Sequence, residues 1–158
     1  MLPVDEKLNI LIAPGAKVNN ASFTSNVLDT QGFKYARIYF LIGAIDATMA
    51  TLKIQESDGK SSATALDSNA VDVVGTRVGT DNTDAYPAAT STLPGSSNTN
   101  IIIGFEIDVR SRKRYLQLVA TSGSGAAGVY GVAWAELERG EQTPTTAADK
   151  NLFEVMRV

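Results

Sequence analysis

The sequence contains neither cysteine nor histidine, and these two absences remove most of the common catalytic chemistries. Without cysteine, the chain can form no disulfide, no thiolate zinc site and no cysteine nucleophile. Without histidine, it lacks the usual general base, the commonest metal ligand and the side chain that titrates near neutral pH. What remains is carboxylate chemistry, serine–lysine chemistry or no chemistry.

Long apolar runs and an excess of positive charge are also missing. No stretch approaches the ~20 apolar residues that a membrane-spanning helix needs. The start, MLPVDEKLNILIAPG, carries Asp5 and Glu6 rather than the features of a secretory signal. The formal net charge of −3 argues against a basic nucleic-acid-binding domain. We therefore expect a single soluble domain, residues 1–158, made in a cytosol, with no membrane or nucleic-acid partner.

Alternation of apolar and polar residues dominates the chain, which is the pattern of half-buried strands. In the first segment Leu8, Ile10 and Ile12 share one face, and Lys7 and Asn9 share the other. We predict strands at 7–13, 21–29, 34–43, 50–57, 70–78, 100–109, 114–122 and 128–137. Turn signals lie between these segments, and no long amphipathic helix is evident. The pattern predicts an all-β protein, a sandwich or barrel of about eight strands.

Two of these segments have a distinctive second face. In segment 34–43 Ile38, Phe40 and Ile42 share one face, while Tyr39 and Leu41 share the other. Apolar residues on both faces predict a strand that is covered on both sides. Segment 128–137 places bulky residues on one face (Tyr130, Val132 and Trp134) and small residues on the other (Gly131, Ala133 and Ala135).

Two polar regions interrupt the strand pattern. Residues 79–100 form a long irregular loop in which Tyr86 and Leu93 are the large apolar residues. Such a loop is uncommon in a compact domain and is often functional or disordered. Residues 139–158 form a C-terminal arm that begins polar and ends apolar, with Leu152 and Phe153. Large apolar groups in polar segments often anchor to a partner, so these four side chains are candidate partner contacts.

The stretch TSGSGAAGVYG contains a match to G-x-G-x-x-G at Gly123, Gly125 and Gly128. A dinucleotide-binding loop with this pattern lies between a strand and a helix. Here the residues that follow favour a strand, because small and bulky side chains alternate. Only 30 residues remain after Gly128, too few for the rest of a doubly wound sheet. We predict a connection between two strands.

Three other patterns could carry chemistry. Ser57 and Lys60 match the S-x-x-K of serine–lysine enzymes, but Asp-Gly between them predicts a turn. Glu106 and Asp108 could pair as in a glycosidase, yet they lie on the predicted outer face. An oxygen-rich group that could bind calcium comprises Asp81, Asn82 and Asp84, without EF-hand spacing. We expect no catalytic residue, cofactor or metal, and therefore a protein that is not an enzyme.

A basic cluster, RSRKR, joins two strong strand patterns. It contains Arg110, Arg112, Lys113 and Arg114, with Arg112 and Lys113 expected at the tip of a turn. The flanking basic residues are expected near the acids Glu106 and Asp108. Three readings remain open, namely a solvated turn, contact with an acidic partner surface and contact with nucleic acid. The absence of interleaved aromatic residues and the acidic net charge make nucleic acid the weakest of the three.

Three longer stretches carry a resemblance to a known group: YARIYFLIGAIDATMATLKIQES, FEIDVRSRKRYLQLVATSG and VAWAELERGEQTPTTAADKN. Together they resemble small virion proteins of tailed bacteriophages and prophages, the capsid decoration or cement proteins. The resemblance covers most of the chain and is weakest at 79–100. It implies an antiparallel, jelly-roll-like β-sandwich that binds as a homo-oligomer, a dimer or trimer, to the exterior of an assembled capsid.

The resemblance also implies a role and a partner. Such a protein bridges subunits of the major capsid protein and stabilises the shell, so its location would be the virion surface. The family has no catalytic residues to carry over. The alternative is a binding module of another class, a carbohydrate-binding domain or a tail-fibre tip, which would present exposed aromatic residues along one sheet face. A carboxylate glycosidase is the enzyme alternative, and it requires two acids across a cleft.

Overall fold

The computed structural model describes residues 6–74, 76 and 93–139. Within these ranges the chain forms strands and turns, and it contains no helix long and apolar enough to cross a membrane. The strands are β1 (Glu6–Ile12), β2 (Leu28–Asp29), β3 (Tyr35–Ile42), β4 (Thr51–Ser57), β5 (Lys60–Ser62), β6 (Ala65–Leu66), β7 (Val71–Asp72), β8 (Ile101–Asp108), β9 (Tyr115–Thr121) and β10 (Gly131–Glu138).

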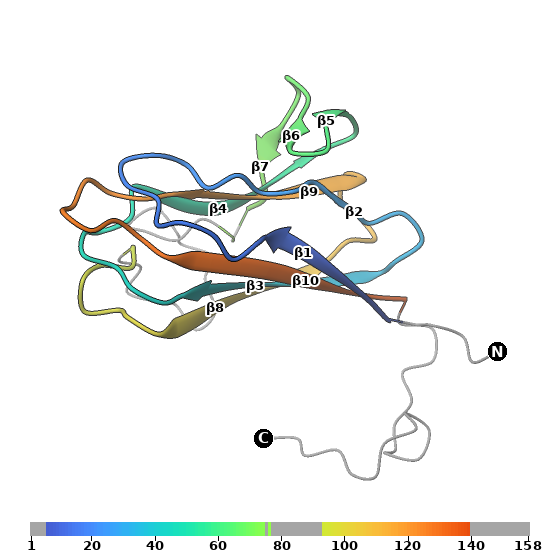
Figure 1. The fold of residues 1–158 in the computed structure, drawn as a ribbon. Helices are drawn as coiled ribbons and strands as arrows, with labels where there is room; N and C mark the ends of the chain where they lie inside the picture. The colour runs from blue at the N-terminus through green and yellow to red at the C-terminus, as the bar shows by residue number, and fades with distance from the viewer. Residues whose placement is uncertain (1–5, 75, 77–92, 140–158) are drawn as a thin grey trace, which may run out of the picture.

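Two antiparallel sheets face each other as a sandwich (Figure 1). One sheet has the strand order β1-β10-β3-β8 and the other has the order β2-β9-β4-β7, while β5 and β6 form a small separate hairpin. Successive strands from β1 to β4 alternate between the two sheets. β7 lies in the same sheet as β4, and the alternation resumes from β8 to β10. This order is that of a jelly roll, in which two four-stranded sheets are built from interleaved strands. The predicted all-β sandwich of about eight main strands is confirmed.

The core lies between the two sheets and is lined by the alternate residues that the sequence pattern predicted. Apolar side chains at every second position point inward, and those nearest the centre are at most 1% exposed. They are Ile38, Phe40 and Ile42 of β3, Leu52 and Ile54 of β4, Leu116 and Leu118 of β9, and Ala133, Ala135 and Leu137 of β10. Each fully buried large aliphatic or aromatic side chain contributes roughly 1.5–3 kcal/mol through the area it removes from water.

The small residues of β10 leave room for the largest buried side chain of β3. Phe40 lies opposite Ala133 in the strand register. Its ring meets Phe23 edge-on, with the centroids 5.7 Å apart and the planes at 74°. A methyl group on Gly131 would lie 2.6 Å from the Phe40 ring, a distance that no real contact tolerates. The alternation of small and bulky residues in this segment is therefore required by packing.

The first strand departs from the predicted pattern. The register between β1 and β10 shifts between Ile10 and Ile12, so that Leu11 and Ile12 are both buried. Leu8 and Ile10 instead point away from the core and are 67% and 60% exposed. The prediction that Leu8, Ile10 and Ile12 share one face was therefore wrong, because a β-bulge adds one residue and turns Ile12 to the other side.

Candidate functional site

The outer face of the β1-β10-β3-β8 sheet carries a group of apolar side chains that no described strand covers, since the second sheet packs on the opposite face (Figure 1). Neighbouring strands bring these residues into cross-strand rows. We define the apolar patch as Ile10, Trp134 and Tyr39 in one row, Val132, Leu41 and Ile102 in the next, and the adjoining Leu8.

The apolar patch has an aromatic centre and aliphatic margins. The rings of Tyr39 and Trp134 lie 5.3 Å apart with a 31° tilt. Tyr39 also packs over Gly104, where an added methyl group would lie 3.4 Å from the ring. Burial raises the pKa of Tyr39. At the margins Ile10 is 60% and Ile102 57% exposed.

The remaining part of the same face is acidic. One row contains Glu136, Arg37 and Glu106 beside Leu8, and the next contains Glu6, Glu138, Tyr35 and Asp108. Arg37 binds Glu138 through its guanidinium and lies 3.9 Å from Glu106. The outer face is therefore divided into an apolar part and an acidic part, and this division sets what could bind it.

Asp108 is held in its charged form by the turn that follows β8. Its carboxylate accepts hydrogen bonds from the Arg110 guanidinium at 2.5 and 2.9 Å and from the Arg110 backbone amide at 3.1 Å. These contacts lower the pKa of Asp108 to about 2 and raise the pKa of Arg110. A general acid needs a carboxyl group that keeps its proton near neutral pH, and Asp108 does the opposite.

These carboxylates predict how stability depends on pH. Asp29, Asp67 and Asp108 all have a lowered pKa, caused first by side-chain hydrogen bonds from Arg114, Ser57 and Arg110 respectively. A lowered folded-state pKa stabilises the fold above the unfolded pKa and loses that stabilisation as pH falls through the folded value. We expect the free energy of unfolding to be level above about pH 5 and to fall between about pH 4 and pH 2. Urea denaturation at a series of pH values would measure this, and Asp108→Asn should flatten the slope. An equal slope in that variant would contradict the assignment.

The basic turn between β8 and β9 brings together the four predicted basic residues and binds each of them within the chain. Arg110 also lies over the Tyr35 ring at 5.3 Å. Arg112 lies 3.7 Å from Glu56, whose carboxylate also accepts the Lys113 backbone amide at 3.1 Å. The Lys113 ammonium donates to the Asn69 carbonyl at 3.3 Å.

The carboxylate that binds Arg114 is distant in the sequence. It donates to both oxygens of Asp29, at 2.6 and 2.9 Å, and lies over the Tyr115 ring at 4.8 Å. The expectation that Arg114 would lie near Glu106 or Asp108 was wrong, because the second sheet brings β2 beside β9. Three carboxylates of the chain itself therefore neutralise much of this turn, although its guanidinium groups remain partly exposed.

Of the predicted contact residues outside the turn, the structure places one. Leu93 is partly buried and packs against the hydrophobic core. It therefore contributes to the chain's own interior. Tyr86, Leu152 and Phe153 lie outside the described residues, as do the calcium candidates Asp81, Asn82 and Asp84. Within the described ranges no three acidic side chains gather as a metal site would require.

The glycine-rich segment is a connection between β9 and β10, as predicted, and no helix begins in it. Gly125 packs against the carboxylate of Asp46, which also accepts the Ala127 backbone amide. The Asp46 carboxylate occupies the position that a phosphate group would take, and its negative charge would repel that group. One oxygen of Asp46 is buried without a hydrogen-bond partner. Gly128 has a φ of +73°, a conformation that favours glycine.

The two residues of the S-x-x-K pair lie on different strands, Ser57 at the end of β4 and Lys60 at the start of β5. Ser57 is fully buried at the end of β4, and its hydroxyl donates to Asp67 at 2.5 Å. Lys60 starts β5 and lies over the Tyr115 ring at 5.4 Å. The two side chains therefore serve different contacts. Glu106 and Asp108, the two candidate glycosidase carboxylates, lie on the outer face of the sheet, where the Glu106 side chain is 83% exposed.

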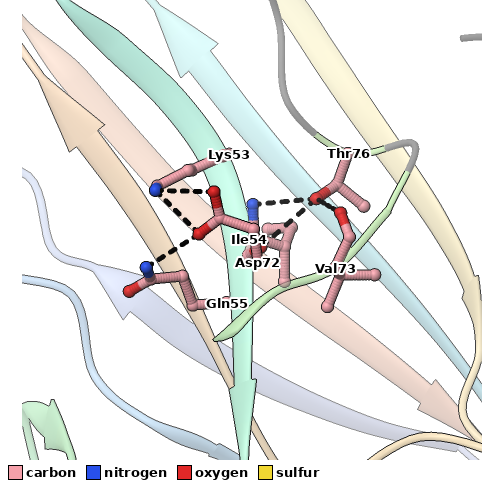
Figure 2. A network of polar contacts seen from close by, with 6 residues as sticks. All are labelled: Lys53, Ile54, Gln55, Asp72, Val73 and Thr76. Atoms are coloured by element: carbon pink, nitrogen blue, oxygen red, sulfur yellow. Dashed lines mark hydrogen bonds and ion pairs between the residues drawn. The ribbon is translucent and has the colours of Figure 1, made fainter. Parts of the chain in front are cut away.

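A polar network at the edge of β4 is structural (Figure 2). Asp72 of β7 accepts hydrogen bonds from Lys53 and Gln55, both at 2.8 Å. The hydroxyl of the buried Thr76 accepts the Ile54 amide at 3.1 Å and donates to the Val73 carbonyl at 2.8 Å. These contacts hold β7 and the following turn against β4, at the edge of the sheet.

The apolar patch is the functional candidate that the sequence analysis missed. Its signal was present, since Tyr39, Leu41, Val132 and Trp134 were placed on the second face of their strands. Tyr39 and Leu41 were assigned to a strand covered on both sides, whereas Val132 and Trp134 were described only as the bulky face of theirs. The described structure covers only one side.

The chain was compared with protein families, curated sequences and solved structures. No protein-family model and no curated protein sequence matches the chain. The structure is similar to the crystal structure of SPBc2 prophage-derived protein YomS, with a TM-score of 0.43 and 11% identity, over 84% of this chain and 92% of that one. It is less similar to the Tobacco streak virus coat protein, with a TM-score of 0.26 and 8% identity, over 91% of this chain and 93% of that one. The chain thus has a structural match to a prophage-derived protein and a weak one to a viral coat protein.

Proposed function

We propose that this chain is a non-enzymatic structural protein of a bacteriophage particle, which binds the exterior of the capsid and stabilises the shell by bridging subunits of the major capsid protein. The observation that carries the proposal is the apolar patch on the outer face of the β1-β10-β3-β8 sheet. Exposed apolar groups gathered in one place mark interaction sites on a protein surface, and aromatic residues at the centre of such a patch are typical anchors.

The polar chemistry of the described residues agrees with a binding role. Ser57, Asp108 and the residues of the basic turn are engaged in contacts within the chain. A decoration protein needs a stable β core and a surface that adheres to a repeating lattice. Several weak contacts made by one oligomer add up through effective concentration.

Binding to capsids tests the proposal. Cognate capsids prepared without this protein, in the unexpanded and expanded states, would be mixed with the purified chain and sedimented. We expect cosedimentation with an assembled state and much weaker binding to soluble major capsid protein. Absence of cosedimentation with both states, or equal binding to the soluble subunit, would overturn the proposal.

A matched pair of variants tests the role of the apolar patch. Ile10→Asp places a charge in the patch, whereas Val74→Asp changes a similarly exposed residue (71%) in the turn after β7. Losing the burial of one isoleucine costs roughly 1.5–3 kcal/mol, or about 10- to 100-fold in affinity. We expect that loss for Ile10→Asp and none for Val74→Asp. Equal binding by both variants would exclude the patch as the capsid-binding surface.

A carbohydrate-binding module is the second candidate, and one observation favours it. Tyr39 and Trp134 stand side by side on an open sheet face, where aromatic rings could stack on a sugar. A screen against immobilised glycans, followed by calorimetry, would measure this. Saturable binding that Trp134→Ala abolishes, together with no cosedimentation, would favour this candidate over the capsid.

A further inference from the structure

The four edge strands of the sandwich differ in how they are protected against pairing with another strand. A long, regular edge strand exposes a row of backbone donors and acceptors, and proteins blunt such edges with short strands, bulges or inward-pointing charges. In the second sheet the edges are β2 and β7, and each has only two residues. Thr76 further closes the β7 side through its contacts with β4 (Figure 2).

The β1 edge of the first sheet is protected in two other ways. Its register with β10 shifts between Ile10 and Ile12, so the strand does not present an even row of backbone groups. Lys7 lies opposite Leu137, whose side chain is fully buried, and so Lys7 is on the core side of the sheet. An incoming strand would have to bury that charge.

The β8 edge has none of these protections. Its eight residues, Ile101–Asp108, pair with β3 in one uninterrupted register, and they include neither proline nor lysine. Among the described strands, β3 is its only neighbour. On the core side Ile101 and Ile103 remain only partly buried, and on the outer side Ile102 is 57% exposed. Apolar side chains at this edge therefore remain partly accessible on both faces of the sheet.

We propose that β8 pairs antiparallel with β8 of a second copy of this chain, so that two four-stranded sheets join into one continuous sheet. Antiparallel pairing of identical strands is isologous, and it closes into a dimer about a two-fold axis. The proposal concerns self-association, and it does not depend on what the apolar patch binds.

The sequence of β8 selects a register. Centring the two-fold axis on Ile103 places Ile101 opposite Phe105 of the second copy on the core side. On the outer side it places Ile102 opposite Gly104 of the second copy, where the isoleucine would pack beside the Tyr39 ring that lies over this glycine. Centring the axis on Gly104 would instead place Ile102 opposite Glu106 of the second copy, and centring it on Glu106 would oppose two carboxylates, which is destabilising.

Self-association can be measured on the intact chain by sedimentation equilibrium. One added strand pair buries less than the ~800 Å² per partner of a standard interface, so we expect a concentration-dependent dimer. Ile102→Lys should raise the dimer dissociation constant at least about 10-fold, because it replaces the apolar contact of Ile102 near the two-fold axis with an ammonium group. Ile10→Lys is the matched control, since it changes an equally exposed isoleucine of the same face on the opposite edge, and it should leave the dimer unchanged. Circular dichroism would check that both variants fold.

Each other outcome overturns the proposal. A chain that remains monomeric at millimolar concentration has no such edge pairing. Equal weakening by Ile102→Lys and Ile10→Lys would assign the dimer to the sheet face instead. Cosedimentation with capsids is a separate measurement, so either proposal can fail alone.

The absence of cysteine allows a direct test of the register. With the axis at Ile103, the two copies of this residue lie about 4.5–5.5 Å apart between Cα atoms, which suits a disulfide. Mild oxidation should therefore link Ile103→Cys into covalent dimers. Asp108→Cys should not link, because its counterpart would lie about ten residues away along the paired strands, on the order of 30 Å. Equal linking of both variants, or none at Ile103, would overturn the register.

Discussion

The Phe40→Ala variant is expected to lose about 3–5 kcal/mol of unfolding free energy, the usual cost of removing a buried aromatic ring. Phe40 is fully buried and lies between Phe23 and the backbone of Gly131, so removal of its ring would leave a cavity inside the core. The chain has a single tryptophan, Trp134, on the neighbouring strand, so its fluorescence reports unfolding in a denaturant titration.

A double-mutant cycle gives this prediction its control. Gly131→Ala alone should destabilise the chain, because the added methyl group meets the Phe40 ring at 2.6 Å. In the Phe40→Ala background the same methyl group enters the cavity instead, and its cost should shrink or vanish. Residues in contact show such non-additivity. Additive costs would mean that the two positions do not share this space.

The Gly123→Ala variant is expected to lose about 3 kcal/mol, near the upper end of the usual cost of overpacking. A methyl group on Gly123 would lie 2.0 Å from the Thr48 backbone carbonyl. The neighbouring loop also uses Gly123, since the Asn20 amide donates to its carbonyl at 3.1 Å. Because Gly123 lies between backbone atoms of two other segments, no flexible side chain can move away to make room for the methyl group.

Gly15→Ala is the matched control for the connecting loop. Its added methyl group would meet only the Ala13 carbonyl at 3.8 Å, an ordinary contact. A surface substitution of this kind usually changes stability by less than about 0.5 kcal/mol. If the two variants unfolded at the same denaturant concentration, the close approach at Gly123 would not determine the stability of the loop.

The sequence predicted the fold class well because the strand period is local. Residues 100–109 and 114–122 have a period of two, and each forms a long strand at the predicted place. Local patterns could not predict the bulge in β1, since no residue there marks an extra position. They also could not show that Arg114 binds Asp29, because that contact depends on which strands become neighbours.

The candidate site was harder to predict for a related reason. The pattern identified Tyr39 and Trp134 as bulky residues on the second face of their strands, but periodicity does not say what lies above a face. Exposure of Leu8 and Ile10 follows from the bulge, which the sequence did not reveal. The apolar patch exists only once β1, β10, β3 and β8 have been placed side by side.

The strand order has a consequence for how the protein is made. The last two strands that the structure describes, β9 and β10, occupy central positions in the two sheets. β10 is the only described strand that joins β1 to β3, through pairings as distant in sequence as Glu6 with Glu138. A chain still emerging from the ribosome therefore holds two incomplete sheets until β9 and β10 are released. Completion of both sheets must wait for these two strands, and such non-local topologies fold slowly.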